Sequence, residues 1–183
     1  MMIGEPSEAA KFLKNGKIIT YPTECIYGIG CDPFNEDAVN KIYQIKKREK
    51  NKPMIIVASE IEQIGKLVDI TLLTDNVKKS WPGNNTWIIP SLDSCPKWLV
   101  NEENRSVAIR VSSHPVISQI CRAFSKPIIS TSANISLEKP IKNFENLLEV
   151  FEDKIDFFTK GELGDEVRPS VIREMQSGKI LRN

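Results

Sequence analysis

The chain has 183 residues, which is long enough for one domain with a hydrophobic core of its own. Its 25 basic and 24 acidic residues give a formal net charge of +1, so the composition does not indicate a uniformly basic nucleic-acid-binding protein. A hydrophobic content of 40% and a charged content of 27% are typical of a globular protein. A local basic patch is still compatible with this balance.

The cysteines and the single histidine do not predict a metal site. Cys25, Cys31, Cys95 and Cys121 have irregular spacings without a C-x-x-C pair, and His114 is the only histidine. The first residues lack the apolar segment of a signal peptide, and no apolar run reaches membrane-spanning length. We therefore expect a reduced, cytoplasmic protein without a membrane anchor.

The first part of the chain predicts a strand and a loop between two helices. Ser7 is the expected N-cap of a helix that ends near Lys14, before an Asn-Gly pair. Residues 17–23 are expected to form a strand, and residues 24–34 a loop. Asn35 is the expected N-cap of the next helix. The apolar positions that should face the core at helical spacing are Ala38, Val39, Ile42, Tyr43 and Ile45.

The rest of the chain interleaves strands with helices. Residues 53–59 predict a short buried strand, after which Ser59 caps a helix. Further strands are expected at residues 86–92, 106–112, 126–131, 155–159, 169–174 and 179–182, and further helices at residues 72–80, 115–124 and 144–152. This order predicts an α/β (or α+β) fold with a twisted, mixed, open sheet flanked by helices, in one domain over residues 1–183.

The run KKREKNKP at residues 46–53 is the most basic segment, with five basic residues among its first seven. Cations interact well with the dipole at a helix end, and a charged run usually forms a solvated surface. The run also continues into a loop, since Asn51 and Pro53 end the helical pattern. A loop with several cations can hold a polyphosphate, and Arg48 could bind it with two parallel hydrogen bonds. Both interpretations remain open on these grounds.

The segment TYPTECIYGIGCD at residues 20–32 has two glycines after a strand. Gly28 and Gly30 permit a tight backbone path. The segment is not G-x-G-x-x-G, because Pro33 takes the third glycine position, and the chain has no G-x-x-x-x-G-K-[ST] motif. In isolation, Thr23 and Glu24 are expected to satisfy backbone groups of a turn.

The segment STSANIS at residues 130–136 follows an apolar run and is small and polar. Serine and threonine at a strand end often cap the next helix, but Pro140 interrupts the sequence that follows here. Ser130, Ser132 and Asn134 could instead donate to phosphate oxygens or to a base edge. Arg110 lies in a strand rich in Val and Ile, where a buried cation needs a carboxylate from the protein or from a substrate.

Several segments in this order resemble the YrdC/TsaC family of threonylcarbamoyl-AMP synthases over almost the whole chain. The matching segments are YPTECIYGIGCDP, KKR with KP following, WPG, VAIRV, STSANIS and RPSVIR. The chain resembles the short, single-domain form of the family. The resemblance implies an α/β twisted open sheet with a concave, positively charged cavity.

The resemblance also implies the reaction and its substrates. Family members make L-threonylcarbamoyladenylate and diphosphate from L-threonine, bicarbonate and ATP, and other proteins then transfer the threonylcarbamoyl group to tRNA. Magnesium is expected to arrive with ATP, without a metal site or a covalent nucleophile on the protein. The residues expected to bind ATP are Lys46, Arg48, Lys52, Ser106, Ser132, Asn134, Lys142 and Ser170. Those expected to bind threonine are Thr23, Arg110 and Ser132.

Three positions depart from the family pattern: Glu49 replaces a proline, Leu137 replaces a glycine, and Val57 stands where some longer members have a histidine. The change at Leu137 predicts a different local turn. The main alternative function is a non-catalytic RNA-binding or ribosome-maturation module that uses the same cavity, in contact with tRNA or double-stranded RNA. The neutral net charge counts against it. A carbamoyl-transfer domain of hydrogenase maturation proteins is a third reading, but such domains accompany modules for which this chain has no room.

Overall fold

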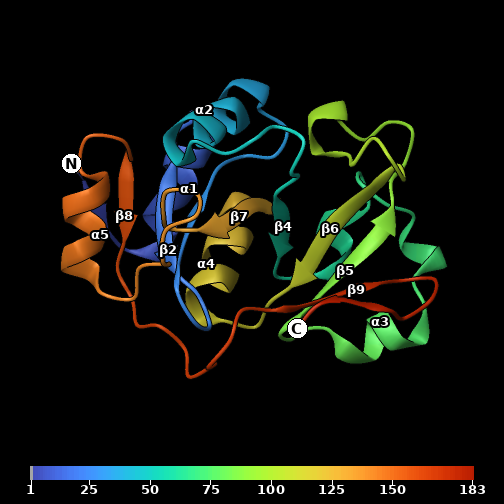
Figure 1. The fold of residues 1–183 in the computed structure, drawn as a ribbon. Helices are drawn as coiled ribbons and strands as arrows, with labels where there is room; N and C mark the ends of the chain where they lie inside the picture. The colour runs from blue at the N-terminus through green and yellow to red at the C-terminus, as the bar shows by residue number, and fades with distance from the viewer. Residues whose placement is uncertain (1) are drawn as a thin grey trace.

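Ten strands of the computed structural model, which describes residues 2–183, form one open sheet with parallel and antiparallel neighbours (Figure 1). The strand order is β1-β8-β2-β3-β7-β4-β6-β5-β9-β10. The strands are β1 (Ile3–Gly4), β2 (Ile19–Pro22), β3 (Tyr27–Gly30), β4 (Ile55–Ala58), β5 (Asn85–Pro90), β6 (Ser106–Val111), β7 (Ile128–Ser132), β8 (Phe157–Thr159), β9 (Val171–Glu174) and β10 (Ile180–Arg182). The helices are α1 (Pro6–Lys14), α2 (Glu36–Lys46), α3 (Asp75–Ser80), α4 (Pro115–Phe124) and α5 (Phe144–Phe151). The expected mixed, open sheet with flanking helices is confirmed.

Helices cover both faces of the sheet, because successive strand residues point to opposite sides. On one face α1 and α4 pack against β2, β7 and β8 through a cluster that includes Tyr21, Ile128 and Phe157. On the other face α2, α5 and the segment before β5 form a larger core that includes Ile56 and Ile129. None of the helices within residues 2–183 is long and apolar enough to cross a membrane.

Strand β3 was not predicted, since residues 24–34 were expected to form a loop. It pairs antiparallel with β2 and with β7. Glycine weakens a strand, which is why the sequence favoured a loop, but here a close approach requires it. A Cβ at Gly30 would lie 2.3 Å from Ile129 O and 3.0 Å from the Tyr21 ring. The glycines therefore serve strand packing and not a turn.

Two of the predicted helix caps were wrong and one was right. Asn35 accepts a hydrogen bond from Ala38 N and caps α2 as expected. The N-cap of α1 is Glu5 and not Ser7, and its backbone N–H donates to the Glu8 carboxylate at 2.8 Å. After β4 a short 3-10 helix (Ile61–Ile64) follows with Glu60, not Ser59, at its N-cap. The helix expected over residues 72–80 begins only at Asp75, after a Thr74 cap.

The backbone at Leu137 has a φ of 74°, in the left-handed region that favours glycine. The side chain is fully exposed at the surface. The sequence predicted a turn that differs from the glycine-type turn, and this prediction is wrong for the φ angle of Leu137. Leucine occupies a conformation that a glycine would adopt more easily.

One long crossing segment joins the two halves of the sheet. After β8 the chain runs along the bottom of the view to β9 (orange to red in Figure 1). On the way Gly164 N donates to Thr23 O and Glu166 N donates to Glu24 O, each at 2.9 Å. The crossing segment thus fixes the loop between β2 and β3, which forms part of the site described next.

Candidate active site

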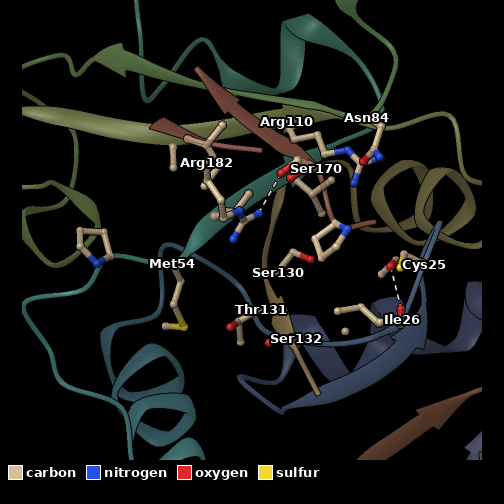
Figure 2. Close-up of a pocket in the computed structure, with 18 of the residues that line it drawn as sticks. Cys25, Ile26, Met54, Asn84, Arg110, Ser130, Thr131, Ser132, Ser170 and Arg182 are labelled. Atoms are coloured by element: carbon tan, nitrogen blue, oxygen red, sulfur yellow. Dashed lines mark hydrogen bonds between the residues drawn. The ribbon is translucent and has the colours of Figure 1, made fainter. Parts of the chain in front are cut away.

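A cavity of about 470 Å³ lies over β3, β4, β6 and β7, with residues of β9 and β10 at its rim (Figure 2). Alternate residues of strand β6 form one wall of the cavity. Ser106, Ala108 and Arg110 line the cavity, whereas Val107, Ile109 and Val111 between and after them are buried in the core. A cavity of this size is typical of a small-molecule site.

Strand β4 follows the same rule, whereas three successive residues at the end of β7 reach the cavity. Val57 of β4 and Ser130 and Ser132 of β7 line the cavity, while Ile56 and Ile129 lie in the core of the opposite face. Figure 2 shows the hydroxyl-bearing residues of β7 side by side. The polar end of β7 therefore provides small hydrogen-bonding groups to the cavity, while Asn134 lies outside its lining.

Arg110 is held at the cavity wall by two contacts. Its Nε donates to Gly83 O at 2.9 Å, and its Nη2 lies 2.5 Å from Glu24 Oε1. The second contact is an ion pair without hydrogen-bond alignment, since no acceptor is well placed for Nη2. Only 11% of the Arg110 side chain and 15% of the Glu24 side chain are exposed. Burial lowers the pKa of Arg110 although Glu24 opposes this, and a guanidinium stays charged at neutral pH.

Lys46 lies outside the cavity lining and joins the end of α2 to the end of β7. Its Nζ donates to Ser132 O, to Asn134 O at 2.7 Å and to Asn134 Oδ1 at 3.3 Å. Ser132 Oγ donates to the same Asn134 Oδ1 at 2.6 Å. The three predicted residues are therefore in contact, but only Ser132 reaches the cavity. Because its three donors are used, Lys46 orients the segment that carries Ser132.

Burial lowers the pKa of Lys46 from 10.5 to about 8, and the charge of Arg48 acts in the same direction. Between these pH values the unfolded chain binds a proton at Lys46 that the folded chain lacks, so the free energy of unfolding rises with pH. We expect the free energy of unfolding of the wild type, minus that of Lys46→Met, to rise by up to ~1.4 kcal/mol per pH unit over this range. Urea unfolding followed by circular dichroism measures the difference. A flat or falling difference would contradict the shift.

Arg48 lines the cavity from the loop after α2, whereas Lys52 and Lys142, like Lys46, do not. Its Nε donates to Lys52 O at 2.9 Å and its Nη2 to Pro53 O at 3.0 Å, which leaves N–H groups for a ligand. The Lys52 ammonium is exposed and pairs with Glu49 at 2.8 Å. Lys142 is exposed as well. The departure at Glu49 therefore adds an ion pair within the loop.

The predicted hydroxyl residues Thr23, Ser106 and Ser170 all line the cavity and already have partners. Thr23 Oγ1 donates to a carbonyl of its own turn at 2.7 Å, and Ser106 Oγ donates to Asn104 Oδ1 at 2.5 Å. Ser170 Oγ shares a hydrogen bond of 2.7 Å with the hydroxyl of Thr86. A ligand acceptor therefore has to compete with these internal acceptors.

The polar lining residues that were not predicted to belong to the site include Glu24, Asn84 and Arg182. Figure 2 shows Asn84 beside Arg110, and Arg182 directed toward Ser170, whose carbonyl accepts from Arg182 Nη2 at 2.9 Å. Arg182 reaches the cavity because β10 pairs with β9. No local motif indicates this, so only the register of that hairpin could have revealed it.

The charged groups of the lining are three arginines and one glutamate. Arg48, Arg110 and Arg182 contribute the positive charges, and Glu24 contributes the negative one. Within residues 2–183, no group of three or more His, Cys, Asp or Glu side chains is placed to hold a metal ion. The chemistry available to the site is therefore that of guanidinium groups, hydroxyls, amides and one carboxylate.

The chain is similar to known proteins over nearly its whole length. The family model of the Sua5, YciO and YrdC proteins, described as "Telomere recombination", matches residues 11–183. A threonylcarbamoyl-AMP synthase of Methylococcus capsulatus is 43% identical over 176 residues, which cover 95% of this chain and 94% of that protein. A threonylcarbamoyl-AMP synthase of Coxiella burnetii (strain RSA 493) is 42% identical over 96% of this chain and 95% of that protein.

Solved structures share the fold. The structure of P. abyssi Sua5 complexed with L-threonine superimposes with a TM-score of 0.87 at 25% identity, over 98% of this chain and 56% of that one. The structure of E. coli YciO superimposes with a TM-score of 0.84 at 19% identity, over 100% of this chain and 93% of that one. This chain thus spans little more than half of P. abyssi Sua5, and at 19% identity the second match supports the fold alone.

Proposed function

The chain belongs to the Sua5/YciO/YrdC family, and we propose on this basis that it is a threonylcarbamoyl-AMP synthase. It makes L-threonylcarbamoyladenylate and diphosphate from L-threonine, bicarbonate and ATP. The product supplies the threonylcarbamoyl group for an adenosine of tRNA, through separate transfer proteins. The names of the curated relatives, which match over nearly the whole chain, support this activity.

One structural observation carries the proposal: six of the ten predicted site residues line the same cavity. They come from segments far apart in the sequence and are Thr23, Arg48, Ser106, Arg110, Ser132 and Ser170. Because these residues were assigned through the resemblance in sequence and not from the cavity, their convergence on one cavity supports a common ligand.

The residues divide into two groups around the reacting atoms. Arg110 and Thr23 hold the carboxylate and hydroxyl of threonine, with Ser132 between them and the nucleotide. Arg48 binds the phosphates, and we add Arg182 to this set because its guanidinium lines the same cavity. Lys46 and Asn134 act indirectly, by orienting Ser132.

The remaining nucleotide contacts follow from position. Ser106 and Ser170 provide hydroxyls to the nucleotide from the wall and the rim. Lys52 and Lys142 lie outside the lining, so their assignment to ATP requires their loops to approach the bound ligand. Magnesium enters as part of the MgATP substrate.

The reaction then proceeds by positioning. The threonine ammonium first loses a proton to solvent; the free amine then attacks the carbon of bicarbonate, and loss of water leaves a carbamate on the nitrogen. A carbamate oxygen attacks the α-phosphorus of ATP, and the bond from that phosphorus to the oxygen bridging to the β-phosphorus breaks, releasing diphosphate. Alignment of the two reactants and cations placed against the phosphate charge lower the barrier without a nucleophile on the protein.

The non-catalytic RNA-binding alternative is not favoured. The curated relatives are named as synthases, and the chain is nearly neutral overall, with a net charge of +1. A nearly neutral chain has no general attraction for RNA phosphates, on which such a module would depend.

Diphosphate release tests the proposal. Purified protein is incubated with MgATP and bicarbonate, with and without L-threonine, and diphosphate is measured with a coupled assay. We expect release that requires both threonine and bicarbonate, and a threonylcarbamoyladenylate product by mass spectrometry. Folded protein that releases no diphosphate under these conditions would overturn the assignment.

A further inference from the structure

Glu24 is the only acidic residue that lines the cavity among residues 2–183. It lies between Thr23 and Cys25, in the loop that the crossing segment holds through the Glu166 N to Glu24 O hydrogen bond. Synthesis of the adenylate needs cations beside the phosphates, but the steps given for it assign no role to a protein carboxylate. The position of Glu24 beside Arg110 therefore requires an explanation.

The two oxygens of the Glu24 carboxylate have different surroundings. Oε1 lies 2.5 Å from Arg110 Nη2 and accepts a hydrogen bond from Ser112 Oγ at 2.5 Å. Oε2 is buried and has no hydrogen-bond partner. A buried carboxylate oxygen without a partner is unfavourable, so a movement of the carboxylate that brings this oxygen to a donor is favoured.

Other groups near Glu24 leave this oxygen unpaired. Burial lowers the pKa of His114 although the charge of Glu24 opposes this, so burial disfavours a second cation beside the carboxylate. Arg110 is the single cation paired with Glu24. The pair is therefore balanced in charge while the cavity is empty.

This balance restricts which ligands the pair can accept. A simple carboxylate bound to Arg110 would bring a second negative charge beside Glu24 in a poorly solvated place, which is costly. A zwitterionic amino acid brings one charge of each sign. Its carboxylate can take a place at Arg110 while its ammonium pairs with Glu24, and all four charges are then compensated.

We propose that Glu24 binds the α-ammonium group of the amino-acid substrate and, with Arg110, makes the site selective for zwitterionic amino acids. The substrate carboxylate exchanges with Glu24 at the Arg110 guanidinium, and the Glu24 carboxylate turns to the ammonium. This inference rests on the proposed function, since it concerns the threonine end of the same cavity. It assigns to Glu24 a role in specificity that the sequence motifs did not suggest.

A purely structural ion pair would behave differently. If Glu24 served only to neutralise Arg110, its removal would affect stability, and any loss of binding would be similar for all carboxylate ligands. If Glu24 binds the ammonium, removal of the Glu24 charge weakens the binding of threonine far more than the binding of an analogue without the amino group. The comparison of two ligands therefore separates the two roles.

The experiment compares L-threonine with 3-hydroxybutanoate, which lacks the amino group, by isothermal titration calorimetry. The variant is Glu24→Gln, which keeps an oxygen for Ser112 and Arg110 but has no charge. The control is Glu166→Gln, which removes the charge of an exposed glutamate that also influences Arg110 but does not line the cavity. Thermal melting of each protein confirms that it is folded.

We expect Glu24→Gln to weaken threonine binding by about 100-fold, with 3-hydroxybutanoate changed by less than about threefold or bound more tightly. The wild type and Glu166→Gln should both prefer threonine strongly. Equal binding of threonine by the wild type and by folded Glu24→Gln, or an equal loss for both ligands, would overturn the role of Glu24 and leave the proposed function intact. Wild-type protein that binds no threonine, with or without ATP, would overturn both.

Discussion

Replacement of Arg48 by alanine should lower kcat/KM for ATP by about 100-fold, as expected when a preorganised cation is removed from a reacting phosphate. Arg48 lines the cavity, and two of its N–H groups hold the carbonyls of Lys52 and Pro53. The change removes a phosphate ligand and loosens the loop that presents it. The fold should persist, because both internal partners belong to the same surface loop. Diphosphate release at varied ATP measures the effect.

Two matched variants show whether the geometry or only the charge of Arg48 matters. Arg48→Lys keeps the charge but loses the planar fork, so activity should lie between those of the wild type and the alanine variant. Lys50→Ala removes one positive charge from an exposed position in the same run and should leave activity close to wild type. Wild-type turnover by Arg48→Ala would remove this residue from the phosphate site.

The strand pattern predicted much of the fold, and its failures have physical causes. Helix α4 begins and ends where the sequence predicted, since Pro115 and the apolar spacing mark it clearly. Strand β3 was missed because its glycines oppose strand formation locally, while contacts with Tyr21 and Ile129 require them. Ile129 is distant in sequence from these glycines, so local propensity could not reveal this contact.

The candidate site was predictable where a motif and a strand coincide. In β6 the alternation of Ser106, Ala108 and Arg110 with buried valines and isoleucine already assigns these three residues to one face. The role of Lys46 was harder to predict, because a basic run suggests a solvated loop while its first member is buried against the end of β7. Burial of a single lysine depends on the tertiary arrangement and not on the run itself.

Arg182 and Glu24 escaped prediction for a different reason. Arg182 enters the cavity through the pairing of β10 with β9, and Glu24 through its contact with Arg110. Both depend on which segments the sheet brings together. The strand order places β9 beside β5, far from β8 in the sheet, and a single sequence does not determine this order.

Replacement of Arg110 by alanine should raise KM for L-threonine by about 100-fold, while KM for ATP changes little, because the guanidinium provides charge-assisted hydrogen bonds to a carboxylate. Steady-state diphosphate release at varied threonine measures this separation. Stability needs a separate measurement, since removal of one partner of a buried ion pair leaves the other charge uncompensated. Arg110 and Glu24 form such a pair.

The double variant Arg110→Ala with Glu24→Gln resolves this difficulty, because it removes both charges together. It should melt at a higher temperature than Arg110→Ala alone and still have a strongly raised KM for threonine. Arg122→Ala is the control for loss of a cation, since its pair with Glu60 is exposed and such pairs contribute little. Unchanged threonine dependence in folded Arg110→Ala would exclude this residue from the site. A raised KM for ATP alone would instead assign Arg110 to the nucleotide site. The pair of Glu24 and Arg110 would then not bind the two charged groups of an amino acid.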